Sequence, residues 1–437
     1  MTFMTSSINR QDSFPKKADV VIAGGGIIGA SIAWFLSKKN ISVVLCEKGK
    51  IAGEQSSRNW GFCRQQGRDL KELPLMQESL RIWTNLEKEI GANVGFRKVG
   101  SLYLARDEEK MSSMEKWLKD VSDFNLDTQL MSASNINTIL HGTSHTWVGG
   151  MLTPSDGRAE PLLATSEIAN AAKTEGATIL TNCAVRGIDT KGGRVSHAIT
   201  ENGEIETNIV VLAGGVWSTL FLRRFGLRFP QLLVHSSVFR TSPAPLISEC
   251  NVWDENFAFR RRLDSSYTIA NGSFTLVELV PDNFRLFRKF LPIFKLESKR
   301  LAFRIRLGKA FIKSLKMPKD WPLDRKSPLE TYRVLNPKPY MPILFKTVNA
   351  LRKDIPILNK VRIASCWAGY IDVTPDALPV ISFINSPPGL FLASGFSGHG
   401  FGIGLGAGKL ASELILNEAP SVDPTPFRWA RTFGLHE

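Results

Sequence analysis

The chain has 437 residues, 43% of them hydrophobic, and a formal net charge of +14. This size and apolar content predict a large core and more than one domain. The five cysteines form no C-x-x-C pair, which argues against a structural zinc site or a disulfide framework and for a reducing compartment. The sequence contains no run of eighteen apolar residues, so no membrane-spanning helix is predicted. The first residues, MTFMTSSINRQDSFPKK, do not resemble a secretory signal, so we expect a cytoplasmic protein.

Residues 18–49 predict a strand, a glycine turn, a helix and a second strand. We expect a buried strand at Val20–Ala23, a helix at Ile27–Ser37 and a strand at residues 41–46. Asn40 lies between helix and strand, where a left-handed residue is needed. A βαβ unit of this kind predicts a parallel sheet covered on both faces.

Later segments continue the mixed pattern. Helices are predicted at residues 73–89, within 108–140, and from Pro161 to about Gly176. Strands are predicted at residues 100–107, after Gly176 and at 208–218, followed by antiparallel strands over 230–280. The segment GLFLASGFSGHGFGIGLGAGKLASELIL again predicts strand, turn and helix.

The fold class is therefore predicted as α/β, with a Rossmann-like domain assembled from three chain segments. The second domain is predicted as α+β with a mostly antiparallel sheet. We expect the first domain to comprise residues 15–90, 146–228 and 361–437, and the second to comprise residues 91–145 and 229–360.

The glycine turn has the spacing Gly24-x-Gly26-x-x-Gly29. Such a turn lets the backbone approach a pyrophosphate, with Ile27 and Ile28 in the first turn of the helix. Glu47, at the end of the second strand, is placed to bind ribose hydroxyls and would repel a 2′-phosphate. Together with Lys48 these residues predict an adenine dinucleotide other than NADP.

A second glycine-rich turn favours FAD over NAD. It precedes the last helix, whose N-terminus would stabilise negative charge on a reduced flavin. The residues that we expect at this end of the cofactor are Gly395, Gly398, His399, Gly400, Phe401 and Gly402.

Besides both glycine turns, the chain contains the segments SSRNWGF, VVLAGGVWS and WAGYIDVTPDALPVI. In these features it resembles the FAD-dependent D-amino-acid oxidase superfamily, in its glycine oxidase, sarcosine oxidase and D-amino-acid dehydrogenase branch. The resemblance implies oxidation of a C–N bond in an amine or amino acid by hydride transfer to flavin N5, followed by imine hydrolysis. It also implies cofactor contacts from Ser56, Ser57, Arg58, Val185, Gly214 and Trp217.

The sequence departs from this family at the expected substrate clamp. Many members have an arginine where Ile371 stands, between Tyr370 and Asp372. Sarcosine oxidases have an arginine three residues after the corresponding loop glycine, and Gly61 to Arg64 has the same spacing. The resemblance therefore implies that Arg64 binds a substrate carboxylate, with Arg68 as the next candidate. The alternative for Arg64 is a contact with FAD or backbone.

Two further residues leave alternatives open. Asp372 either attracts a substrate ammonium group or is a buried structural carboxylate. His399 either shapes its turn or acts in acid–base chemistry beside the flavin. We predict Arg64, Tyr370, Asp372 and His399 as the catalytic set, and no metal site.

Cys366 suggests two interpretations, a covalent flavin tether or a small buried core residue. We predict non-covalent FAD. Sarcosine oxidases have a lysine where Gly402 stands, so the sequence does not point to a simple α-amino acid as the substrate. No lysine is clearly placed to activate oxygen at flavin N5, so a dehydrogenase is favoured over an oxidase.

The segment from Arg285 to Lys319 contains twelve Lys or Arg and one acid, a net +11 that leaves +3 for the rest of the chain. Its predicted amphipathic helix either packs on its own domain or binds an electron-acceptor partner or the inner face of a membrane. The charge is concentrated in this one segment and has no Tyr or Trp interleaved with it, which argues against binding of nucleic acid. An alternative function is the flavoprotein subunit of a multi-component opine- or quinone-linked dehydrogenase.

Overall fold

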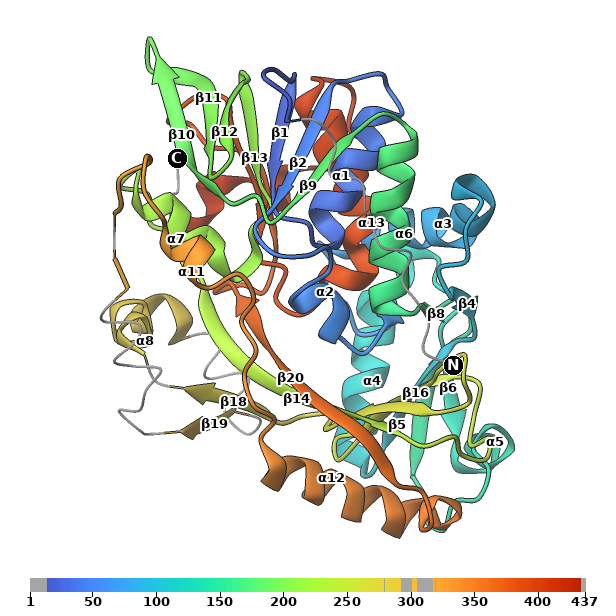
Figure 1. Cartoon of the computed structure of the whole chain (residues 1–437). Helices are drawn as coiled ribbons and strands as arrows, with labels where there is room; N and C mark the ends of the chain where they lie inside the picture. Colours follow the sequence, from blue (N-terminus) through green and yellow to red (C-terminus); the bar gives the residue numbers. More distant parts are fainter. Residues whose placement is uncertain (1–13, 279, 292–300, 305–316, 319, 434–437) are drawn as a thin grey trace.

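The computed structural model describes residues 14–278, 280–291, 301–304, 317–318 and 320–433. Two layered halves meet in the middle of the molecule (Figure 1). One half is a mainly parallel sheet flanked by helices, and the other is a large, mostly antiparallel sheet.

The first half is built around a six-stranded sheet that gathers strands from distant parts of the chain. Its order is β21-β22-β13-β1-β2-β9, and every neighbouring pair is parallel except β21 and β22. The strands are β1 (Val20–Ala23), β2 (Val43–Glu47), β9 (Thr178–Thr181), β13 (Ile209–Leu212), β21 (Val380–Phe383) and β22 (Leu390–Ser394).

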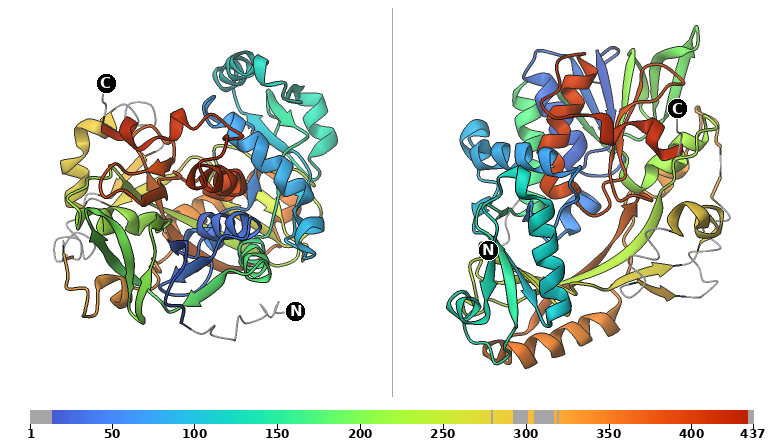
Figure 2. Two further views of the ribbon diagram at one scale, coloured as in Figure 1. Left: turned by 90° about the horizontal axis from the view of Figure 1, so that it is seen from above. Right: turned by 180° about the vertical axis from the view of Figure 1, so that it is seen from behind.

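Helices cover one face of this sheet and a small antiparallel sheet packs on the other. A Cβ on Gly408 would lie 2.4 Å from the Ser31 Cβ, so the absent side chain is what allows the last helix to lie against α1. Figure 2 shows this pair, blue and red, side by side from above. The helices are α1 (Ile27–Ser37), α3 (Leu73–Ile90), α6 (Pro161–Thr174) and α13 (Gly400–Ile415); the strands of the small sheet are β10 (Val185–Lys191), β11 (Arg194–Thr200) and β12 (Gly203–Glu206).

The second half is a ten-stranded sheet in which β14 (Leu232–Thr241) and β20 (Ile363–Val373) form one long antiparallel pair. Beneath it lies α12 (Met341–Asp354), which buries Ile343, Leu344 and Leu351 against the sheet (Figure 1). The other strands are β5 (Ser101–Ala105), β6 (Gln129–Ser132), β7 (Gly149–Thr153), β15 (Asn251–Trp253), β16 (Ala258–Arg261), β17 (Tyr267–Ala270), β18 (Thr275–Glu278) and β19 (Leu301–Arg304).

The remaining elements pack around the two large sheets or link them. The small sheet β3-β8-β4 lies between them. The bounds are α2 (Gln55–Arg58), β3 (Phe62–Cys63), β4 (Arg97–Lys98), α4 (Glu108–Asp120), α5 (Ala133–Ile139), β8 (Gly157–Arg158), α7 (Ser218–Arg223), α8 (Pro281–Arg285) and α11 (Pro328–Thr331).

The predicted fold class is confirmed, and so are its first elements. The first strand and helix have the predicted bounds, and Asn40 has a left-handed φ of 60°. Strands β7 and β20 belong to the ten-stranded sheet. We therefore propose that the domain boundaries expected at residues 146 and 361 lie after these two strands.

The predicted basic helix is wrong at residues 301–304, which form β19 beside β18. Main-chain pairing with a sheet edge overrides a helical pattern there. Residues 292–300, 305–316 and 319 of the same segment lie outside the described residues. Among the described helices, none is long and apolar enough to cross a membrane.

Candidate functional site

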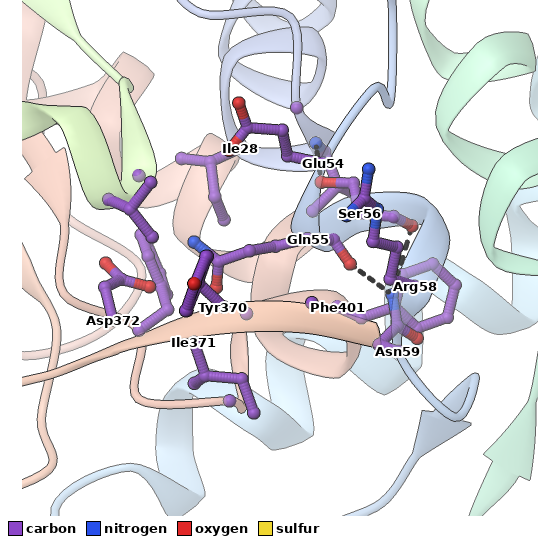
Figure 3. Close-up of a pocket in the computed structure, with 18 of the residues that line it drawn as sticks. Ile28, Glu54, Gln55, Ser56, Arg58, Asn59, Tyr370, Ile371, Asp372 and Phe401 are labelled. Atoms are coloured by element: carbon purple, nitrogen blue, oxygen red, sulfur yellow. Dashed lines mark hydrogen bonds between the residues drawn. The ribbon is translucent and has the colours of Figure 1, made fainter. Parts of the chain in front are cut away.

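A cavity of about 390 Å³ lies where the two halves meet. Its wall combines the glycine turn before α1, the segment from Gly53 to Arg68, and the turn before α13. The second half adds Ser236 of β14, Asn271 and Phe274 from the connection between β17 and β18, and Tyr370 and Ile371 of β20. Figure 3 shows side chains from α2 and β20 converging in this cavity.

The glycine turn forms a cradle that has no room for side chains. A Cβ on Gly24 would lie 2.4 Å from the Ala213 carbonyl oxygen, and one on Gly29 would lie 2.0 Å from the Gly24 oxygen. Gly26 caps α1 without a side-chain hydrogen bond, so the helix N-terminus opens on the cavity through Gly26, Ile27 and Ile28. Bare backbone and a helix N-terminus suit a pyrophosphate. Gly29 lies behind this surface and packs the helix on the strand.

Glu47 is the half-buried carboxylate at the end of β2. Its oxygens accept hydrogen bonds from the amides of Gly25 and Gly49, both at 2.7 Å. Burial nevertheless raises the pKa of Glu47. The carboxylate remains in the cavity wall, where further lone pairs can accept ribose hydroxyls.

Lys48 follows it and is held by three acceptors. Its Nζ donates to Glu54 Oε1 at 3.1 Å and to the carbonyls of Tyr332 and Arg333, each at 2.8 Å. The same Nζ lies 4.0 Å from the centre of the Trp217 ring. Burial lowers the pKa of Lys48. With Val185 and Gly214, Trp217 completes the wall predicted for the cofactor.

Of the three α2 residues expected to contact the cofactor, two line the cavity and one does not. Ser56 lines the cavity and its Oγ accepts a hydrogen bond from the Ile27 amide at 2.9 Å. Arg58 also lines it and donates from Nη1 to the Ala368 carbonyl at 3.0 Å, which links α2 to β20. The Ser57 hydroxyl instead donates to the Glu54 carbonyl at 3.2 Å, and Ser57 is absent from the cavity wall.

A buried ion pair fixes the loop that follows α2. Arg260 donates from Nη1 and Nη2 to the Glu160 carboxylate at 2.8 and 3.1 Å, and its Nε donates to the Trp60 carbonyl. Gly61, at φ 83°, passes so close that a Cβ there would lie 2.5 Å from Arg260 Nε. The loop is therefore pinned at Trp60 and Gly61, immediately before the predicted clamp.

Arg64 lines the cavity as predicted. Its Nη1 donates to the Gln66 carbonyl, and its Cζ lies 5.5 Å from the centre of the Tyr103 ring. Arg68 also lines the cavity but is buried, and its Nε donates to the Arg64 carbonyl at 3.1 Å. Burial, reinforced by the charge of Arg64, lowers the pKa of Arg68 to about 10.

Strand β20 brings Tyr370, Ile371 and Asp372 to the cavity (Figure 3). Asp372 Oδ2 accepts hydrogen bonds from Gln231 Nε2 at 2.8 Å and the Gly395 amide at 2.9 Å, and burial raises its pKa. These protein donors favour the structural carboxylate over the ammonium site, because they stabilise the buried group without a ligand.

The turn before α13 has the left-handed residues Gly395, Ser397 and Gly398, followed by His399 as the N-cap residue. Gly398, His399, Gly400, Phe401 and Gly402 line the cavity, whereas Gly395 contacts Asp372 behind it. A Cβ on Gly402 would lie 3.1 Å from the Phe62 carbonyl.

Several residues of the cavity region went unnoticed in the sequence, among them Glu54, Gln55 and Glu72. Glu54 and Gln55 line the cavity (Figure 3), and Gln55 hydrogen-bonds Asp372. Glu72 lies behind the wall, fully buried, with Oε2 3.0 Å from His399 Nδ1 and 3.6 Å from Arg68 Nη1. The GEQSSR stretch could have indicated the first two. Glu72 is an acidic residue just before a predicted helix, and nothing in the sequence distinguishes it from other such residues.

Cys366 is not a buried core residue. It is exposed on β20, which corrects the expectation of a buried core residue, and it is absent from the cavity wall. Among the described residues, no cluster of three or more His, Cys, Asp or Glu could hold a metal ion.

These residues fit FAD. The cradle of glycines at the α1 N-terminus suits the pyrophosphate, Glu47 suits a ribose, and the second helix N-terminus, at His399, lies in the same cavity.

Comparisons with known proteins agree with this reading. Residues 19–414 match the family model described as FAD dependent oxidoreductase. Sarcosine dehydrogenase of Homo sapiens is 24% identical over 426 residues, 94% of this chain but 41% of the relative, so the chain spans less than half the length of that protein. Glycine oxidase of Bacillus subtilis is 22% identical, with 95% of this chain and 96% of the relative covered.

A solved structure is similar over almost the whole chain. L-amino acid deaminase from Proteus myxofaciens, in complex with anthranilate, has a TM-score of 0.91 and 32% identity, covering 96% of this chain and 94% of that chain. From the family match, the glycine cradle and the paired helix N-termini, it follows that this chain belongs to the FAD-dependent oxidoreductase family and that its cofactor is FAD.

Proposed function

We propose that this enzyme oxidises the C–N bond of an amino acid or N-methyl amino acid to an imine, which water then hydrolyses. The observation that carries the proposal is the position of Arg64 in the wall of the cavity that also contains the cofactor cradle. A guanidinium there can bind a carboxylate through two parallel hydrogen bonds.

The local charge supports an anionic substrate. Arg68 Nη1 lies 3.6 Å from the buried Glu72, and the charge of Arg64 also acts on that carboxylate. The other acid near both arginines is Asp156, whose pKa burial raises to about 7, so it offsets their charge only in part. Arg68 Nη1 is buried without a hydrogen-bond partner among the described residues. A substrate carboxylate would offset this excess of positive charge.

The names of similar proteins support the substrate class. They include a sarcosine dehydrogenase, a glycine oxidase and an L-amino acid deaminase. Anthranilate, bound in the last of these, carries both a carboxylate and an amino group. Each name describes its own protein, and together they favour an amino-acid carboxylate at Arg64.

The chain's residues divide the work between cofactor and substrate. Gly24, Gly26 and the α1 N-terminus would hold the pyrophosphate of FAD, and Glu47 a ribose. Bound FAD supplies the two-electron acceptor for the C–N bond. Ile371 and Phe274 offer apolar surface, while Arg64 would fix the carboxylate and thereby orient the amine.

Anaerobic flavin reduction tests this proposal. Purified FAD-loaded protein is mixed with D- and L-amino acids, N-methyl amino acids, opines and amines that lack a carboxylate. We expect rapid bleaching with a carboxylate-bearing amine and much slower bleaching with its decarboxylated analogue. Equal rates for the two would remove the role of Arg64, and no bleaching by any amine would overturn the proposed function.

A further inference from the structure

A buried acid lies directly behind His399 with unused hydrogen-bonding capacity. Glu72 is 0% exposed, and neither of its carboxylate oxygens has a hydrogen bond of good geometry among the described residues. Oε2 is nevertheless 3.0 Å from His399 Nδ1, a distance at which the two groups can form a hydrogen bond once they are aligned. Buried acids without partners are uncommon and call for a functional reason.

Two helix N-termini meet at this pair. Glu72 is the N-cap residue of α3 and His399 is the N-cap residue of α13. The partial positive charge of a helix N-terminus stabilises a carboxylate and disfavours an imidazolium. The fold therefore favours an ionised Glu72 beside a neutral His399.

Neighbouring charges also favour an ionised Glu72 and a neutral His399. Burial and Arg68 lower the pKa of His399, with a smaller contribution from Arg64, while Glu72 opposes them. Burial acts to raise the pKa of Glu72, but His399, Arg68 and Arg64 together bring it below its usual range. At neutral pH the imidazole is thus unprotonated at one nitrogen and can accept a proton.

The geometry assigns which nitrogen that is. A proton on Nδ1 would be donated to Glu72, which leaves Nε2 with a free lone pair. The His399 side chain is 28% exposed and lines the cavity, and Nε2 has no hydrogen-bond partner among the described residues. The free nitrogen is the one available to a substrate.

We propose that Glu72 positions His399 so that Nε2 accepts the proton of the substrate ammonium group. The inference rests on the proposed function, because it requires an amine substrate. One N–H bond of the ammonium breaks, its proton passes to Nε2, and the electron pair stays on the substrate nitrogen. An amine with this free pair can form the C=N bond, whereas an ammonium cannot.

Glu72 makes this transfer less costly. The positive charge moves from the substrate to an imidazolium 3.0 Å from a carboxylate, so the product state gains an ion pair. Arg64 and Arg68, which disfavour the imidazolium, also disfavour the ammonium in the same cavity, and their effects partly cancel. His399 is then the catalytic residue and Glu72 a positioning residue.

The test compares pH profiles of kcat/KM with the best amine substrate. In the wild type we expect kcat/KM to rise with pH through the pKa of His399, which lies below its ordinary value of 6.5. His399→Asn should abolish this acid limb and lower kcat by about 10²-fold. Glu72→Gln should move the limb to lower pH and lower kcat/KM roughly tenfold or more, because the tautomer is no longer fixed. Glu72→Asp, which keeps the charge, should restore much of the loss.

Glu78→Gln is the matched control. Glu78 also joins α3 to α13, through Lys409 at 2.5 Å, but it has no contact with His399. We expect this variant to keep the wild-type pH profile. Flavin content and thermal unfolding, measured for every variant, separate loss of folding from loss of proton transfer.

A readout independent of turnover is 15N NMR of histidine-labelled holoenzyme. Six histidines give signals, and His399→Asn identifies one of them. We expect the Nδ1–H tautomer in the wild type and its loss in Glu72→Gln. An unchanged tautomer in Glu72→Gln, or an unchanged acid limb in His399→Asn, overturns the inference while amine oxidation by the wild type keeps the proposed function intact.

Discussion

The Arg64 guanidinium carbon lies 5.5 Å from the centre of the Tyr103 ring, which belongs to strand β5 of the large sheet. The aromatic face and the Gln66 carbonyl, which accepts a hydrogen bond from Nη1, hold the planar group in one orientation. A lysine would keep the charge but lose the fork that matches a carboxylate.

Arg64→Lys should therefore retain FAD and fold but weaken substrate binding. Loss of one charged hydrogen bond costs about 1.5–3 kcal/mol, equivalent to roughly ten- to more than a hundredfold in kcat/KM. Steady-state kinetics and flavin absorbance measure the two effects separately. Arg64→Ala should lose more.

Arg58→Ala is the contrasting variant, because Arg58 joins α2 to β20 beside the cofactor cradle. It should lower FAD occupancy. If Arg64→Ala oxidised the best substrate as the wild type does, the clamp would lie elsewhere, and Arg68 would be the next residue to test.

Gly29→Ala should lose flavin and stability together. The new Cβ would lie 2.0 Å from the Gly24 oxygen, so the cradle must shift at a cost of at least about 1–3 kcal/mol. Gly91→Ala is a control: its φ of 65° costs about 1–2 kcal/mol, but nothing lies within 4 Å. The flavin-to-protein ratio should fall only in Gly29→Ala; a normal ratio there would contradict the cradle.

FAD should be released by acid precipitation. The structure makes Cys366 a poor tether, because it is exposed and absent from the cavity wall. Flavin fluorescence in a denaturing gel measures covalent attachment, and we expect none with the polypeptide. A fluorescent band in the wild type that disappears in Cys366→Ala would contradict this expectation.

Reduced enzyme should react slowly with oxygen. Lys48 is the one lysine among the described residues of the cavity wall, and its ammonium is committed to Glu54 and two carbonyls. We expect peroxide formation in air to be much slower than reduction of an artificial dye under the same conditions. Equal rates would make the enzyme an oxidase.

The basic segment 285–319 should bring the protein to anionic vesicles if the acceptor is a membrane quinone. Its net charge of +11 predicts binding at low salt that falls steeply as ionic strength rises. Sedimentation with anionic and with neutral vesicles measures it. The absence of binding to anionic vesicles at low salt would remove this role.

Local features of the site were accessible from the sequence. The Gly24–Gly29 spacing, Glu47 and the His399 turn each lie within one strand–turn–helix unit, so near neighbours in the chain define their geometry. Tyr370 and Ile371 were placed by the resemblance rather than by local pattern. Arg64 was likewise placed by the resemblance, through its spacing from Gly61.

Tertiary packing decided the remainder. Glu72 lies beside His399 because α3 and α13 pack together although they are far apart in the sequence. No local sequence pattern encodes that contact. Cys366 has apolar neighbours in sequence, but it lies in the exposed first part of β20, residues 363–366, where no other described element buries it. Residues 301–304 were assigned to a helix because their pairing with β18 is equally non-local.

The order of the six-stranded sheet has a consequence for synthesis. Strand β22, from residues 390–394, pairs with β13, which itself pairs with β1. While the ribosome is still translating the segments before β22, the β13 edge has no neighbour and the α13 side of the cavity does not exist. FAD must therefore bind late in synthesis, after β22 and α13 have been translated. Until then an open, apolar strand edge has to be shielded from aggregation.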